Sequence, residues 1–166
     1  MNQSGKKSSA ASVADREIVS VRVFAAPRTQ VFGAFADPVQ LARWWGPKDF
    51  TATIHEFDLR PGGRWRVTLH GPNGVDFAND KFFTEITAPE RIVFAHRETG
   101  HDFSMAMTFA LHGAGTQLTW RMRFESAADC ARARELIRAA NEQNFDRLAA
   151  HLAQLHSTHA QHAQPQ

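Results

Sequence analysis

The sequence predicts an α+β domain in which a curved antiparallel sheet wraps around one long C-terminal helix. Three observations predict this class. Short strand-like segments separated by turn signals fill the middle of the chain, and a helical stripe of apolar residues follows the last of them. In addition, Arg64–His70 and Thr116–Phe124 alternate apolar with polar side chains, which is typical of strands that have one packed and one solvated face.

The predicted elements follow in a simple order. A first strand is expected at Glu17–Phe24, where valines alternate with other residues. Two short helices come next. One is expected to have Pro27 at its first helical position, and the other has Asp37 as N-cap with Pro38 at the first helical position. Six further strands are expected at Phe50–Leu59, Arg64–His70, Phe77–Ile86, Arg91–Glu98, Phe103–Leu111 and Thr116–Phe124.

The last predicted element is a long helix from about Ala127 to Leu155, with Ser126 as its N-cap. Its apolar residues recur at helical spacing, so one face is expected to pack against the sheet. The whole chain is therefore divided into a disordered leader at 1–15, a single domain at 16–155 and a flexible His/Gln-rich tail at 156–166.

Composition narrows the class of protein. Thirteen Phe and four Trp supply enough aromatic side chains for a core of this size. Lys6 and Lys7 account for the formal net charge of +2, and no cluster of basic residues interleaved with aromatics follows, so we expect no nucleic-acid partner. No apolar run is long enough to span a membrane. Cys130 is the only cysteine, which fits a reducing compartment, and we expect a cytoplasmic protein.

The segment 37–66 carries the most specific motif of the chain. It combines Trp44-Trp45-Gly46-Pro47 with Arg60-Pro61-Gly62-Gly63 and Trp65. With these motifs and this element order, the chain resembles the activator of heat-shock-protein-90 ATPase homologue family, within the START/birch-pollen-allergen-like (SRPBCC) helix-grip superfamily. The resemblance covers about Glu17 to Leu155. It implies a helix-grip fold with an apolar cavity between sheet and helix, and relatives that include lipid carriers, plant hormone receptors and aromatase/cyclases.

A hydrophobic or amphipathic small molecule is the expected partner of this cavity. The polar anchors are predicted to be His96, which shares a strand face with Phe94, and Asn141, which lies within about 40° of Ile137 on the apolar stripe of the helix. A buried amide without a partner costs about 1–3 kcal/mol, so Asn141 must bond to something. The apolar lining is predicted to comprise Trp65, Phe94, Met105, Met107, Trp120 and Phe145.

Two other functions stay open at this stage. One is a cyclase/dehydratase-like or hydrolytic enzyme that uses His96 as its acid or base. The other is a chaperone-accessory or stress-response interaction protein, or a homodimer. We predict no catalytic residues, cofactor or metal site, and we expect Trp44 and Trp45 to pack between the short helices and the sheet edge. The C-terminal histidines are interpreted as solvated residues; they are His151, His156, His159 and His162.

Overall fold

The computed structural model describes residues 12–98 and 102–162, and it confirms the predicted order of elements. A short 3-10 turn at Val13–Arg16 precedes the first strand. The strands are β1 Glu17–Phe24, β2 Thr51–Phe57, β3 Arg64–His70, β4 Asp76–Thr87, β5 Arg91–His96, β6 Phe103–His112 and β7 Gly115–Phe124. The helices are α1 Arg28–Ala36, α2 Pro38–Trp44 and α3 Ala127–His162.

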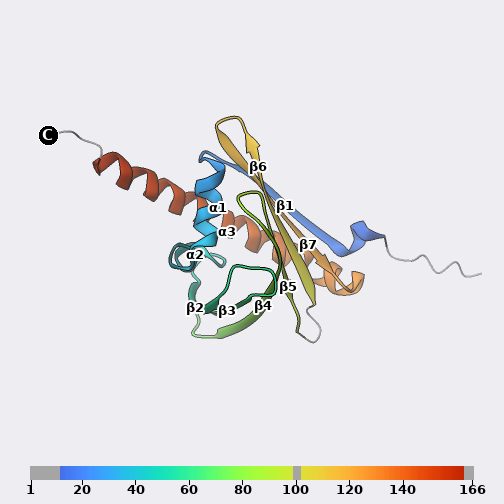
Figure 1. The fold of residues 1–166 in the computed structure, drawn as a ribbon. Helices are drawn as coiled ribbons and strands as arrows, with labels where there is room; N and C mark the ends of the chain where they lie inside the picture. The colour runs from blue at the N-terminus through green and yellow to red at the C-terminus, as the bar shows by residue number, and fades with distance from the viewer. Residues whose placement is uncertain (1–11, 99–101, 163–166) are drawn as a thin grey trace, which may run out of the picture.

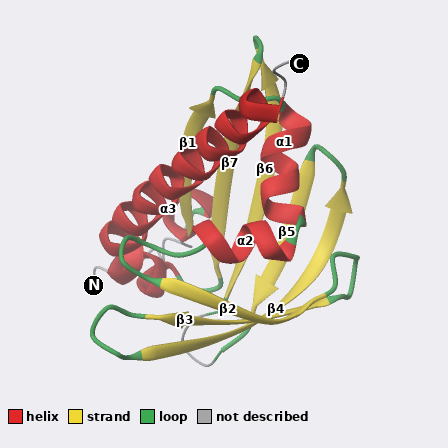
Figure 2. Cartoon of the chain, turned by 90° about the vertical axis from the view of Figure 1, so that its left-hand side faces the viewer, coloured by secondary structure: helices red, strands yellow, loops and turns green. Residues whose placement is uncertain are grey.

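A single antiparallel sheet contains all seven strands, in the order β1-β7-β6-β5-β4-β3-β2. The six strands β2 to β7 form a meander, and β1 closes the far edge by pairing with β7. Figure 2 shows that α1, α2 and α3 all lie on the same side of this sheet, with α3 crossing it near β1 and β7. This arrangement is the helix-grip fold that the sequence predicted.

The ends of the chain differ from the prediction. Helix α3 runs to His162, seven residues beyond the predicted end at Leu155, and its last turns extend past the sheet (Figure 1). Residues 156–162 contain neither Gly nor Pro, so nothing in them stops a helix. The 3-10 turn takes up the end of the predicted leader, whereas residues 1–11 of the leader and 163–166 of the tail lie outside the described residues.

Local signals explain where the short helices begin. The Asp37 carboxylate accepts a hydrogen bond from the Val39 backbone N–H at 2.9 Å and so caps α2, as predicted. Pro27 occupies the N-cap of α1 rather than its first helical position. The turn before β3 depends on Gly63, where a Cβ atom would lie 1.9 Å from the Asp58 carbonyl oxygen. Only glycine fits there, and the turn aligns β3 with β4.

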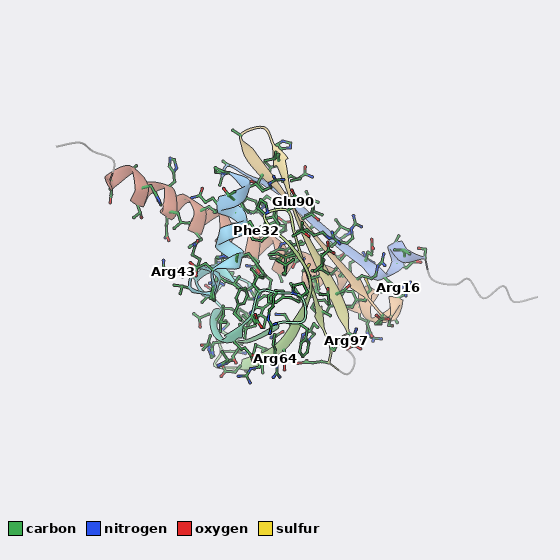
Figure 3. All side chains as sticks on the ribbon, in the orientation of Figure 1. Arg16, Phe32, Arg43, Arg64, Glu90 and Arg97 are labelled. Atoms are coloured by element: carbon green, nitrogen blue, oxygen red, sulfur yellow. The ribbon has the colours of Figure 1, made fainter. Side chains whose placement is uncertain are left out.

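The inner face of the sheet carries the core. Trp44 and Trp45 are buried between the short helices and the sheet, as predicted, and the Trp44 indole donates a hydrogen bond to the Ala34 carbonyl at 2.9 Å. Phe32 points from α1 towards the sheet, where its ring meets that of Phe109 at 5.2 Å (Figure 3). By contrast, Arg64 lies at the periphery on the outer face, where it pairs with Asp80.

Candidate ligand cavity between the sheet and helix α3

A cavity of about 170 Å³ lies between the inner face of the sheet and α3. Its wall combines strands β3 to β7, the middle of α3 and the loop after α2. Among the described lining residues, Lys81 is the only one with an ionisable side chain. The lining residues are Trp45, Gly46, Pro47, Leu69, Asn79, Lys81, Phe94, Phe103, Met105, Trp120, Met122, Ile137, Ala140, Asn141 and Asn144.

The structure places the predicted site residues other than His96 in two groups. The residues that line the cavity are Phe94, Met105, Trp120 and Asn141. The residues that are fully buried in the core without lining it are Trp65, Met107 and Phe145. The Phe145 ring supports the wall from behind, because its centroid lies 4.6 Å from that of Trp120. Contact between these residues and a ligand stays a prediction.

His96 belongs to a neighbouring outer pocket rather than to the cavity itself. This pocket of about 410 Å³ adjoins the cavity, since Asn79, Phe103 and Ile137 line both. The His96 side chain is buried, with Nε2 3.6 Å from a carboxylate oxygen of Glu98 and Nδ1 without a hydrogen-bond partner. Burial, and then the charge of Lys81, lower the His96 pKa. An acid–base role for His96 stays an open alternative.

Lys81 is the residue that the sequence analysis missed. It lies on β4 between its register partners Trp65 on β3 and His96 on β5, so its side chain shares the inner face of the sheet with theirs. Its Nζ atom lies 4.2 Å from the ring centroid of Trp65, 5.4 Å from that of Trp45 and 5.6 Å from that of Phe94. Within the described residues it makes no hydrogen bond or ion pair.

The cation–π contacts of Lys81 do not offset the free-energy cost of removing its ammonium group from water. A cation–π contact contributes about 0.5–2 kcal/mol, whereas removing an ammonium group from water costs several kcal/mol. Burial accordingly lowers the pKa of Lys81 from 10.5 to about 7, and the charge of Glu98 opposes that shift only in part. Near neutral pH the amine is therefore divided between its charged and neutral forms.

The predicted Asn141 and the nearby Asn144 of α3 are both buried and both bonded to protein. Asn141 donates from Nδ2 to the Ser20 hydroxyl on β1 at 3.1 Å. Asn144 donates from Nδ2 to the Trp44 carbonyl at 2.9 Å and accepts from the Gly46 N–H at 3.3 Å. Asn144 therefore holds the loop after α2, whereas Asn141 joins α3 to the sheet at the cavity wall.

Arg147 completes the attachment of this loop to α3. Its Nη1 group lies 3.0 Å from the Gly46 carbonyl and 3.2 Å from the Pro47 carbonyl, and Nη2 lies 3.3 Å from the Arg43 carbonyl. These carbonyls lie at or just beyond the C-terminal end of α2, where a cation interacts favourably with the helix dipole. Arg147 thus fixes the loop that contributes Trp45, Gly46 and Pro47 to the cavity wall.

Replacement of Arg147 with methionine is expected to lower the free energy of unfolding by about 1–3 kcal/mol, because it leaves several part-buried carbonyls without a donor. The Gly46 amide should also exchange with solvent faster. Urea denaturation and amide hydrogen exchange would measure the two effects. Arg138→Met removes an equal charge from an exposed position of α3 and should change neither. Equal stability of the two variants would contradict the inference that Arg147 holds the loop after α2.

Comparison with known protein families matches residues 25–153 to the family described as "Activator of Hsp90 ATPase homolog 1-like protein". The match covers most of the helix-grip domain, including α1, α2, the sheet from β2 to β7 and most of α3. The chain belongs to this family. The motifs around Trp44-Trp45 and Gly62-Gly63 therefore led from the sequence to the correct family.

Solved structures of bacterial proteins share the fold of this family member. A protein of Nitrosomonas europaea is 20% identical and has a TM-score of 0.78, with 87% of this chain and 99% of that chain covered. A protein of Chromobacterium violaceum is 29% identical, with a TM-score of 0.72 and coverage of 81% and 95%. The AHSA1 protein of Silicibacter pomeroyi is 19% identical, with a TM-score of 0.67 and coverage of 82% and 97%.

Further findings exclude some features of the described chain but assign no function. No curated protein matches the chain. No helix in the described part of the chain combines the length and apolarity needed to cross a membrane. The described residues also contain no group of three or more His, Cys, Asp or Glu side chains placed to hold a metal ion. The interpretation of His151 as a solvated residue is wrong, because its side chain is buried with Nε2 3.0 Å from the Gln40 side-chain oxygen.

Proposed function

We propose that this protein binds a small hydrophobic or amphipathic molecule in the cavity between the sheet and α3. The observation that carries the proposal is the cavity wall, in which aromatic and apolar side chains surround a few polar groups. Ligand sites in proteins have this composition, because apolar area supplies affinity and a few polar groups fix orientation. Fold alone would not support the proposal, since the same fold hosts many functions.

The volume of the cavity limits the size of the ligand. A protein cavity of about 150 Å³ is large enough for benzene, whereas pockets for drug-sized ligands measure about 300–1,000 Å³. A volume of about 170 Å³ therefore suits a molecule with one ring or a short branched chain. A longer ligand would have to extend past Phe103 and Ile137 into the outer pocket. The size argues against a sterol or a two-chain lipid held in the inner cavity alone.

Native mass spectrometry of freshly purified protein tests the proposal directly. We expect a retained small molecule that is lost from Ala140→Phe, in which a ring fills the cavity from α3. Ala139→Phe adds the same ring one position away, on the exposed side of α3, and should retain the molecule. If the protein retains nothing, and small aromatic compounds bind equally to the wild type and to Ala140→Phe, the cavity is not a ligand site.

The cytoplasmic location and the possible homodimer stay predictions alongside this proposal. The enzyme and the chaperone-accessory or stress-response interaction protein stay alternatives to it. Cell fractionation would test the location and analytical ultracentrifugation the homodimer. The enzymatic alternative requires turnover of an identified ligand that depends on His96, so the retained molecule has to be known before that alternative can be tested.

A further inference from the structure

Three hydrogen-bond donors at or beside the cavity have no acceptor partner within the described residues. Lys81 has no partner for its ammonium group within the described residues, and the indole N–H groups of Trp65 and Trp120 are buried without partners. The protonated Lys81 amine and the two indole N–H groups can donate but cannot accept. Trp120 and Lys81 line the cavity, and the Trp65 ring lies directly against the Lys81 amine. Such a set lacks an acceptor, and above all an anion.

Within residues 12–98 and 102–162, no group of the protein supplies that anion. Glu98 is the carboxylate whose charge acts on Lys81, but it forms no ion pair with it. Its Oε2 atom instead lies 3.6 Å from His96 Nε2, and its side chain is 46% exposed. The faces of α3 and of the loop after α2 contribute amides and apolar groups to the cavity but no charge. The place of a counter-ion beside Lys81 is therefore left to a ligand.

We propose that the ligand is a carboxylic acid with an aromatic or branched apolar body of roughly ten non-hydrogen atoms, whose carboxylate pairs with Lys81 Nζ. This inference rests on the proposed function and adds the chemical class of the ligand to it. The apolar body would lie against Phe94, Met105 and Trp120. The carboxylate would accept hydrogen bonds from Lys81 and restore a counter-charge to the buried amine.

Proton uptake distinguishes this pairing from simple filling of the cavity. The free protein loses the Lys81 proton near pH 7, and a bound carboxylate raises the pKa of the amine because it favours the charged form. Binding above pH 7 must therefore take up a proton. The His96 pKa is lowered from 6.5, so in the free protein this neighbour of Lys81 releases no proton between pH 7 and 9.

Calorimetric titration of the full-length protein with benzoate and with its neutral isostere benzamide tests the inference. At pH 6.5 we expect benzoate to bind at least about tenfold more tightly than benzamide, as a buried charge-assisted pair requires. Benzoate affinity should fall by up to about tenfold for each pH unit between 7.5 and 9, with about one proton taken up, while benzamide affinity stays constant. Acetate, which has the charge without the ring, should bind far more weakly.

Two variants complete the experiment. Lys81→Met should abolish the preference for benzoate and its proton uptake while benzamide still binds, whereas Lys48→Met, at an exposed lysine, should change neither. If benzamide binds to the wild type as tightly as benzoate, the carboxylate inference is overturned and the proposed function stands. If neither ring compound binds and no molecule is retained by the purified protein, both proposals fail.

Discussion

Replacement of Lys81 with methionine is expected to raise the free energy of unfolding by about 2–4 kcal/mol at pH 6. Methionine has a similar length and fills the space between Trp65, Trp45 and Phe94 without a charge. The variant loses the cation–π contacts but avoids the larger cost of burying an ammonium group. Few single substitutions stabilise a protein by this amount, so the expected effect is large.

The stabilisation should depend on pH in a defined direction. The unfolded chain keeps the Lys81 proton up to about pH 10.5, whereas the folded chain releases it near pH 7. Between these values unfolding takes up a proton, so the stability of the wild type rises with pH in this window. The advantage of Lys81→Met should therefore be complete below pH 7 and shrink steadily as the pH approaches 10.5.

Urea denaturation of both proteins at intervals from pH 6 to pH 10 measures this difference. The other ionisable groups are common to the two proteins, so the subtraction isolates Lys81. Lys48→Met, at an exposed site, should follow the wild type at every pH. A Lys81→Met variant that is less stable than the wild type at pH 6 would show that the amine has a stabilising partner inside the fold.

A buried lysine that weakens the fold is informative about function. Core positions that lower stability are commonly those that serve binding or catalysis. The adjacent side chains on β4 show the contrast, because Phe83, two residues along on the same face, is an ordinary core residue with its ring stacked on Trp65. Lys81, in contrast, lies at the wall of the cavity. Stability and ligand binding therefore make opposite demands on this one position.

The sequence predicted the fold well because its signals are local. Period-two alternation placed Trp65 and Trp120 on the inner face, and helical periodicity placed Asn141 on the buried face of α3. The structure confirms these positions. The same reasoning could not separate residues that line the cavity from those behind them, because Met105 and Met107 share one face of β6 and only Met105 reaches the cavity. That difference depends on where α3 crosses the sheet.

Lys81 was missed because β4 gives a contradictory pattern. The consecutive Phe82 and Phe83 do not reveal which one is buried, and Phe82 is in fact 42% exposed on the outer face. A lysine is also expected at the surface on composition alone. The available signal was the spacing between Lys81 and Phe83, which places both on the inner face once Phe83 is assigned to the core. The unpartnered indoles and the aromatic contacts of Lys81 need the three-dimensional structure.

Replacement of Phe35 with alanine is expected to lower the free energy of unfolding by about 3–5 kcal/mol, as for other buried aromatic residues. Phe35 on α1 is buried in an aromatic cluster that it forms with Trp45 and Trp65. Its ring centroid lies 5.5 Å from that of Trp65 and 5.7 Å from that of Trp45. Its removal leaves a void beneath the Trp45 wall of the ligand cavity. The near-ultraviolet circular dichroism of the tryptophans should therefore weaken even where the variant remains folded.

Two further variants separate volume from position in this cluster. Phe35→Leu keeps most of the side-chain volume and should cost less than about 1.5 kcal/mol, because a core tolerates swaps of similar size. Phe82→Ala removes the same ring from the outer face of β4, where Arg64 lies 5.9 Å from its centroid, and should cost less than about 1 kcal/mol. Urea denaturation ranks the three variants by their free energies of unfolding.

If Phe35→Ala cost no more than Phe82→Ala, the cluster that joins α1 to the cavity wall would not be a rigid support, and Trp45 could move without Phe35. A large cost at Phe35 together with weaker benzamide binding would instead show that the core packing of α1 sets the shape of the cavity.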